Sequence, residues 1–217
     1  MSLTAKDSGG GSFTPVAPGM HLARCYRIVD LGTQKSEFQG QIKHLQKVMM
    51  QFEVHGEDDN GTPMVTSKGE PLSISKNFTL SLAEKATLRK DLQAWRGREF
   101  TADELRGFEL KNVLGAWCML TVAKSTGNNG KEYTNIVSIN PVPAAIKKSG
   151  LPAGFNALTM FVIDNPDMDL FETFGNSLKE KIQATPEWRA RNGGQPASKP
   201  GSTGSGFDDM DDDIPFN

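Results

Sequence analysis

The order of secondary structure along the chain is set by residues 72–97, LSISKNFTLSLAEKATLRKDLQAWRG. In the first part, the apolar Leu72, Ile74 and Phe78 alternate with polar side chains, and only Lys76 interrupts the apolar face. This period of two predicts a β-strand with one buried face. The apolar period then lengthens to that of an α-helix. The stretch therefore predicts a strand that is followed directly by a helix.

The helix has its own start signal. Ser81 and Glu84 form the Ser-x-x-Glu pattern of a capping box, in which two side chains satisfy backbone N–H groups of the first turn. Leu88 and Leu92 follow at helical spacing and predict one apolar stripe. A second box, at residues 101–104, predicts another short helix.

Further strands are predicted on both sides of this stretch. Residues 20–31 and 48–54 are rich in strand-forming side chains, and a polar loop at 32–41 separates them. Residues 112–122 form a long apolar run, and the strand pattern of 132–139 follows a glycine-rich turn. The order is then three strands, a helix and two strands. This is the connectivity of the OB-fold, a small barrel that binds oligonucleotides on one face and with its loops.

The chain divides into five predicted segments. We expect a mainly β fold, with a five-stranded OB-fold barrel at 19–143 that follows a disordered arm at 1–18. Residues 144–191 predict a helical extension, which either packs on the barrel or contacts a subunit or partner. Residues 192–206 are mostly Gly, Ser, Pro, Thr and Ala and predict a flexible linker. Residues 207–217 form a disordered acidic tip.

The extension carries a helical pattern of its own. Asn165-Pro166 marks a helix start, because proline suits the first turn. Phe171, Phe174 and Ile182 then follow helical spacing. They predict a helix that runs through Gly175.

Charge is distributed unevenly along the chain. The formal net charge is -2, from 24 Lys and Arg against 26 Asp and Glu. Five of these acids are aspartates at residues 208–213, so the rest of the chain has 21 acids against 24 bases. A mildly basic body with an acidic tail favours a nucleic-acid-binding protein.

The acidic tip combines carboxylates with apolar side chains. Five carboxylates in one short run cannot be buried together. Exposed isoleucine and phenylalanine are unusual for a purely solvating tail, so the combination predicts a peptide that docks in an apolar pocket rimmed by Arg and Lys. The candidate partner-binding residues are Asp211, Asp212, Asp213, Ile214, Pro215 and Phe216.

The string from Asp211 to Phe216 resembles the C-terminal tip of bacterial single-stranded-DNA-binding proteins, and the linker before it resembles theirs. The resemblance implies a tip that recruits replication, recombination or repair proteins and that also folds back weakly on the DNA-binding surface. Asn217 follows the phenylalanine on which that family usually ends, and residues 19–143 differ from the bacterial proteins in detail. We therefore expect a bacteriophage-encoded protein with a host-type tip, which acts in the bacterial cytoplasm.

Binding of single-stranded DNA without sequence preference requires cations along the backbone and aromatic faces on which bases stack. Candidates are side chains that the strand pattern leaves off the core or places in loops. A solvated surface is the alternative for the cations, and core packing is the alternative for the tryptophan. The candidate residues are Arg24, Lys35, Phe38, Lys43, Lys47, Lys76, Trp117, Lys124, Lys131 and Tyr133.

Catalytic and cofactor motifs are absent from the sequence. There is no phosphate-binding glycine loop, no CxxC pair and no HExxH, and the three histidines are scattered. Cys25 and Cys118 lie in apolar runs and predict buried, reduced thiols. We expect a binding protein without cofactor, metal or membrane span. A nuclease, and an OB-fold interaction module with little intrinsic DNA binding, are the alternatives, and the extension helix would also allow a homo-oligomer.

Overall fold

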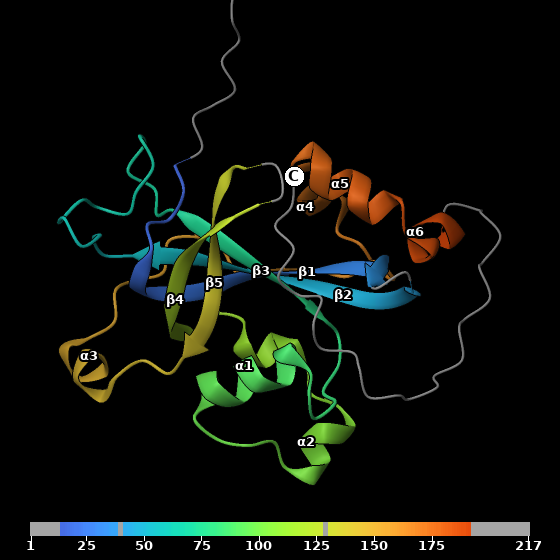
Figure 1. Ribbon diagram of the computed structural model, residues 1–217, viewed down its shortest axis with the longest axis horizontal. Helices are drawn as coiled ribbons and strands as arrows, with labels where there is room; N and C mark the ends of the chain where they lie inside the picture. The colour runs from blue at the N-terminus through green and yellow to red at the C-terminus, as the bar shows by residue number, and fades with distance from the viewer. Residues whose placement is uncertain (1–13, 39–40, 128–129, 192–217) are drawn as a thin grey trace, which may run out of the picture.

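The computed structural model describes residues 14–38, 41–127 and 130–191. A twisted sheet crosses the molecule, two groups of helices lie on either side of it, and the strands near its left end in the view form an upright hairpin (Figure 1). Most of the predicted N-terminal arm, the linker and the acidic tip lie outside the described residues.

One sheet organises the chain, and the prediction of a mainly β fold is confirmed. Its main path has the order β3-β2-β1-β4-β5, and every pairing along the path is antiparallel. A short strand, β6, pairs in parallel with the middle of β1. Within the described ranges β3 and β5 are not paired with each other, so the sheet is open. The strands are β1 (Gly19–Phe38), β2 (Gln41–His55), β3 (Ser73–Thr79), β4 (Trp117–Thr126), β5 (Glu132–Asn140) and β6 (Thr159–Phe161).

The helices are short and fall into two groups. α1, α2 and the 3-10 helix η1 connect β3 to β4, and the other helices follow β5. No helix in the described part of the chain is long and apolar enough to cross a membrane. The helices are α1 (Thr87–Arg96), α2 (Ala102–Arg106), η1 (Leu110–Val113), α3 (Ala144–Ser149), α4 (Met168–Glu172), α5 (Asn176–Gln183) and α6 (Pro186–Arg191).

The segment predicted as a loop at 32–41 is instead part of a long hairpin. β1 continues to Phe38, which lies opposite Gln41 of β2. This arm of the hairpin extends past the core, so its side chains need not alternate between apolar and polar. Gly32 lies at a bulge with a φ of 63°, and a Cβ there would come within 2.8 Å of Ile163. The bulge therefore lets the extension approach β1 closely.

The predicted start of the first helix is wrong, and the second capping box is confirmed. α1 begins at Thr87, five residues later than a capping box with Ser81 as N-cap predicts. The hydroxyl of Ser81 accepts a hydrogen bond from the N–H of Ala83 at 3.2 Å, which forms a local turn that competes with a helix. At α2, Thr101 and Glu104 each accept a hydrogen bond from the other's backbone N–H.

Two apolar cores lie on the sheet. The larger core joins the sheet to α1 and contains Phe52, Phe78 and Leu92. The smaller core joins the middle of β1 to β6 and to α4, α5 and α6. It is rich in aromatic rings, since Phe171 stacks on Trp188 with ring centroids 4.6 Å apart and Phe161 lies between the helices and β1.

The predicted helix through Gly175 is broken there. α4 ends at Glu172, and α5 begins at Asn176 after an extended Gly175. The break directs Phe174 onto the ring of Phe161, with centroids 5.2 Å apart, while Ile182 of α5 stays buried in the same core. The extension is thus attached to β1 by an apolar core of its own.

Candidate functional site

Two predicted cations share one face of the hairpin arm, which comprises residues 32–38 and 41–47. Lys43 and Lys47 are separated by an even number of residues on β2 and therefore project to the same side. Lys35, opposite His44, projects to the other side. The backbone of Phe38 ends β1, and its side chain lies outside the described part of the protein.

A third cation reaches this face from the extension. Burial lowers the pKa of Lys181 on α5 to about 8, and the positive charge of Lys47 adds to this lowering. The side-chain amide of Gln34 donates to the carbonyl of Lys181 at 3.2 Å and so fixes α5 against the arm. We call Lys43, Lys47 and Lys181 the basic face. No sequence pattern marks Lys181, because it directly precedes the buried Ile182 in an otherwise apolar stripe.

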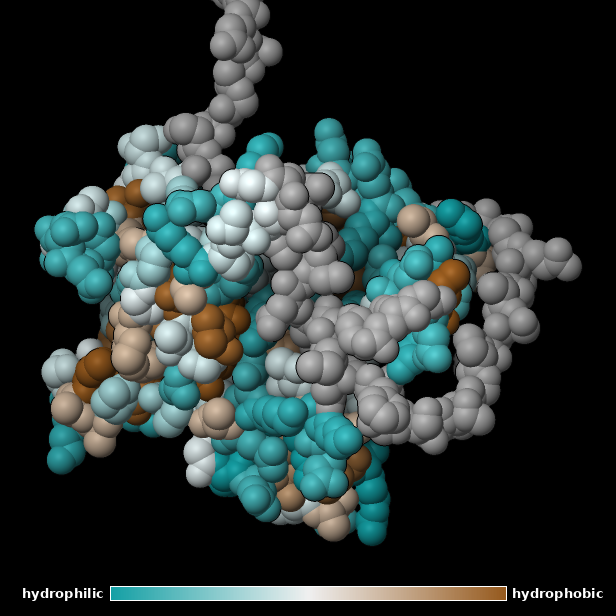
Figure 2. Space-filling view, viewed as in Figure 1, coloured by the Kyte–Doolittle hydropathy of each residue, from teal (hydrophilic) through white to brown (hydrophobic). Residues whose placement is uncertain are grey.

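The predicted residues of the β4–β5 hairpin lie near its turn. Lys124 and Glu132 form an exposed ion pair at 3.1 Å. Lys131 is exposed, whereas Tyr133 is half-buried opposite Ser125. Figure 2 shows hydrophobic side chains gathered over β4 and β5 below this turn. The cations of this hairpin are therefore confined to its turn end, which lies at the same end of the molecule as α4 and α5 in Figure 1.

Two further predicted phosphate contacts lie in internal ion pairs. The side chain of Arg24 is 13% exposed, and its Nε donates to Glu53 at 2.8 Å while Nη2 donates to the carbonyl of Asn156. Lys76 is 8% exposed and pairs with Asp91 of α1 at 2.9 Å. These cations connect elements of the fold, so we do not assign them to the basic face.

Glu53 anchors the first of these pairs. Its side chain is fully buried and accepts hydrogen bonds from the backbone and side-chain N–H groups of Asn156, both at 2.7 Å, and from His55 at 3.1 Å. Burial alone would raise the pKa of Glu53, but these bonds hold it at about 2. The loop at Gly154 is pressed against Arg24, because a Cβ at this glycine would lie 1.7 Å from the guanidinium carbon. We call Arg24, Glu53 and Asn156 the latch.

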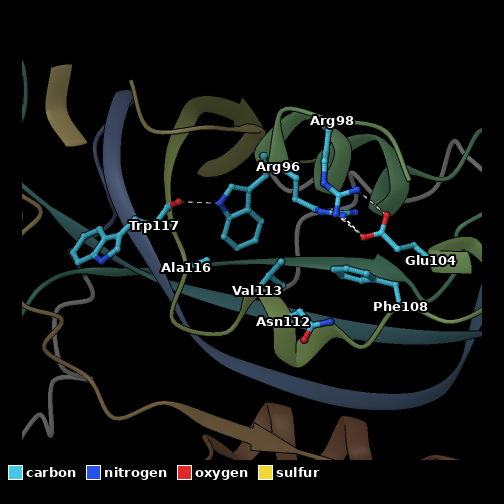
Figure 3. A pocket seen from close by; sticks show the side chains of 9 residues that line it. Arg96, Arg98, Glu104, Phe108, Asn112, Val113, Ala116 and Trp117 are labelled. Atoms are coloured by element: carbon cyan, nitrogen blue, oxygen red, sulfur yellow. Dashed lines mark hydrogen bonds and ion pairs between the residues drawn. The ribbon is translucent and has the colours of Figure 1, made fainter. Parts of the chain in front are cut away.

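Trp117 lies beside the latch at the start of β4. It is the ladder partner of Arg24, and its half-buried ring meets His55 edge-on with centroids 4.9 Å apart. Figure 3 shows its ring turned away from a pocket, while its carbonyl accepts from Nε1 of Trp95 at 2.9 Å. The sequence therefore identified an aromatic side chain near the surface but not the histidine that packs on it.

The pocket beside Trp117 has a volume of about 440 Å³ and lies between α1, α2 and η1 (Figure 3). We call it the α1–α2 pocket. Its apolar lining is made by Trp95, Phe108, Val113 and Ala116. No sequence pattern predicted it, because its lining residues are spread along the chain from α1 to the start of β4.

The polar lining of this pocket is dominated by two guanidinium groups. Arg96 lies over the rings of Phe100 and Phe108, at 4.6 and 4.9 Å from their centroids. Its Nη2 and that of Arg98 both donate to Glu104. The hydrogen bonds from Arg98, and then from the backbone of residue 101, hold the pKa of Glu104 at about 2. Nη1 of Arg96 is buried and has no hydrogen-bond partner among the described residues.

The cysteines and the potential metal ligands of the described residues do not form a reactive site. Cys25 and Cys118 are buried, and burial raises the pKa of Cys25 to about 12, so this thiol is not a nucleophile at neutral pH. Within the described ranges, no group of three or more His, Cys, Asp and Glu side chains could hold a metal ion.

Comparisons with known proteins give no assignment. No protein-family model matches the chain, and no curated protein matches its sequence. The functional argument therefore depends on the residues and geometry described above.

Proposed function

We propose that this chain is a sequence-nonspecific single-stranded-DNA-binding protein with an OB-fold and without catalytic activity. The observation that carries this proposal is the basic face, where Lys43 and Lys47 project to one side of β2 and Lys181 of α5 lies close enough to Lys47 for their charges to interact. Cations that converge on one face of a sheet favour a phosphate backbone as the ligand. Lys131 and Tyr133 would extend the contact to the β4–β5 hairpin, whereas Lys35 projects to the other side of the arm.

The strand order supports the OB-fold. A barrel of this kind closes when its third and fifth strands meet. Here some Cα atoms of β3 and β5 lie within 8 Å of each other, and α1 lies against both strands. The helix thus lies where the barrel would close, which agrees with the order of three strands, a helix and two strands.

Titration of intrinsic tryptophan fluorescence with oligo-dT at several salt concentrations tests the proposed DNA binding. We expect saturable quenching and an affinity that falls by about 0.7 log units per log unit of salt for each phosphate contacted. An oligo-dT affinity that is independent of salt, or equal binding to duplex DNA of the same length, would contradict the proposal.

We further propose that the tip at Asp211–Phe216 recruits replication, recombination or repair proteins and that the chain is encoded by a bacteriophage. The tip lies outside the described residues, so its sequence alone supports this role. Deletion of residues 208–217 should abolish capture of host partners and leave oligo-dT binding intact or tighter. Undiminished partner capture by the truncated chain would refute the role of the tip.

A second candidate is an OB-fold interaction or recombination-accessory module with little intrinsic DNA binding. The ion pairs of Arg24 and Lys76 favour it, because they withdraw two cations from the candidate DNA surface. The two candidates make opposite predictions. Partner capture without oligo-dT binding would favour the interaction module, and oligo-dT binding with a salt slope would exclude it.

A further inference from the structure

The α1–α2 pocket lies apart from the basic face and has the features of a ligand site. Its volume of about 440 Å³ falls within the usual range for small-ligand pockets. The ring of Trp95, the ring of Phe108 and the side chains of Val113 and Ala116 give it apolar surfaces. A planar ring system is the kind of group that such surfaces accept.

The guanidinium of Arg96 has an N–H group that lacks an acceptor among the described residues. Its Nη2 is engaged by Glu104, but its buried Nη1 has no hydrogen-bond partner among the described residues. The flanking rings of Phe100 and Phe108 attract the positive charge without offering an oxygen or nitrogen acceptor. Because buried N–H groups are nearly always paired, an acceptor oxygen in the pocket would satisfy Nη1 once the side chain of Arg96 turns toward the space that it lines.

We propose that the α1–α2 pocket binds one nucleobase of the bound DNA strand, whose ring carbonyl accepts from Arg96 and whose phosphate lies beside Arg98. Such a subsite presupposes the single-strand binding proposed above and adds a base contact to the phosphate contacts of the basic face. Thymine and cytosine have both a stacking face and a ring carbonyl oxygen. The side chain of Arg98 is 53% exposed and can reach a phosphate outside the pocket.

Charge disfavours a strongly acidic peptide as the occupant. Glu104 accepts from both guanidinium groups, and its pKa of about 2 keeps it ionised at neutral pH. A run of aspartates would bring several negative charges against Glu104, whereas the proposed nucleotide brings an uncharged base and one phosphate, which lies beside Arg98.

Photo-cross-linking tests where the base lies. The full chain is irradiated with an oligo-dT that carries a single 5-iododeoxyuridine, and the cross-linked peptides are mapped. We expect adducts at Trp95 or Phe108, the two rings of the pocket. Adducts confined to Trp117 and Tyr133 would overturn the base subsite.

A pocket-filling variant separates stacking from charge. Ala116→Leu puts a larger side chain into the pocket without removing a cation. We expect its oligo-dT affinity to fall about tenfold, because one stacked base is lost, with an unchanged salt slope. The matched control is Ala102→Leu, at an exposed position of α2 outside the pocket, which should bind as the unmodified chain does.

If Ala116→Leu does not fold, which loss of its thermal unfolding transition would show, a second variant still tests the proposal. Arg98→Ala removes a half-exposed rim cation, and its salt slope should fall by about 0.7 as one phosphate contact is lost. If the unmodified chain binds oligo-dT and both folded variants bind it equally well with the same salt slope, the base subsite is overturned. The proposed function would still stand. A lack of oligo-dT binding by the unmodified chain would overturn both.

Titration with three ligands distinguishes a base of the DNA strand from a free nucleotide and from the acidic tip as the occupant of the pocket. The indole N–H signal of Trp95 is followed by NMR during titration with oligo-dT, with dTMP and with a synthetic peptide of residues 207–217. We expect the oligonucleotide to shift this signal at the lowest concentration. A shift at lower concentration of dTMP would assign the pocket to free nucleotides, and one at lower concentration of the peptide would assign it to the acidic tip. Either result would overturn the proposed occupant.

Discussion

At the scale of single residues, Lys181 is held in a charged state that its surroundings disfavour. Its pKa of about 8 lies below the ordinary value of 10.5 because of burial and the neighbouring Lys47. The unfolded chain therefore binds more protons than the folded chain between these two pH values. The free energy of unfolding therefore rises with pH between about 8 and 10.5. Below pH 8 the folded protein bears the full cost of holding Lys181 in its charged form. A bound phosphate would favour the charged form of Lys181, so the same residue would link protonation to the proposed DNA binding.

Lys181→Met should stabilise the protein at pH 7 by an amount of order 1 kcal/mol, allowing for solvent screening of a partly exposed group. The gain should shrink as pH rises from about 8 towards 10.5. Urea unfolding of both proteins at a series of pH values measures this difference. Lys179→Met is the control, because Lys179 on the same helix is paired with Glu172. A stability gain that does not change with pH would contradict the assignment.

Removal of two cations from the basic face should weaken DNA binding in a salt-dependent way. The double variant Lys47→Ala/Lys181→Ala should lower the oligo-dT salt slope by about 1.4, from about 0.7 for each phosphate contact. Fluorescence titrations across a salt series measure the slope. The control Lys179→Ala should keep the full slope, since the side chain of Lys179 is only 20% exposed and lies over the ring of Phe171. Equal slopes in all three proteins would exclude the basic face as the DNA contact.

The latch depends on a glycine that packs against a guanidinium. Gly154→Ala would place a Cβ 1.7 Å from the guanidinium carbon of Arg24, so either the loop or the arginine must move. We expect a loss of about 1–3 kcal/mol in the free energy of unfolding, measured by chemical denaturation. Gly107→Ala is the matched control, because a Cβ there meets nothing within 4 Å. A similar small effect for both variants would show that the latch contributes little.

At the scale of elements, the sequence predicted what depends on local period. The alternation around Ile74 gave β3, and the helical spacing of Leu88 and Leu92 gave α1. The capping boxes predicted α2 correctly but placed the start of α1 too early. The hydroxyl of Ser81, which was expected to cap α1, instead accepts a hydrogen bond within a local turn. Residues 32–41 of the hairpin were predicted as a loop, since a ribbon that leaves the core carries no apolar alternation.

The candidate site was harder to predict, because its contacts join residues far apart in the sequence. Lys43 was identified because it flanks Phe38 of the predicted loop, and Lys47 by its place on a strand, but Lys181 approaches Lys47 only through the packing of α5. The buried pairing of Arg24 could not be foreseen, since Asn156 lies 132 residues away. Pair contacts of this range follow from tertiary structure and leave no periodic signal.

At the scale of the whole molecule, the extension is bound to the sheet by strand pairing, by the latch, by an apolar core and by hydrogen bonds to the hairpin arm. β6 pairs with β1, the latch joins residue 156 to β2, and Phe161 and Trp188 form a core with Val29. The sheet of residues 19–140 and the extension therefore share strand β1.

A chain that ends after Pro143 should consequently not behave as an independent domain. Truncation would expose Val29 and Leu31 and leave Glu53 without its backbone donors from the loop. We expect aggregation or loss of a cooperative thermal transition, observed by circular dichroism and size-exclusion chromatography. A truncated chain that melts cooperatively near the temperature of the full chain would show that the extension is dispensable for folding.

The parallel pairing of β6 also constrains the order of events during synthesis. Arg27 and Thr159 are joined by a side-chain hydrogen bond and by strand pairing, yet 132 residues separate them. At ordinary translation rates, a ribosome needs on the order of ten seconds to produce the residues in between. During that interval the nascent chain carries an incomplete first strand with its apolar outer side chains exposed. Occupancy by a chaperone on the ribosome would therefore be greatest before residue 161 emerges, although most of the sheet has already been made.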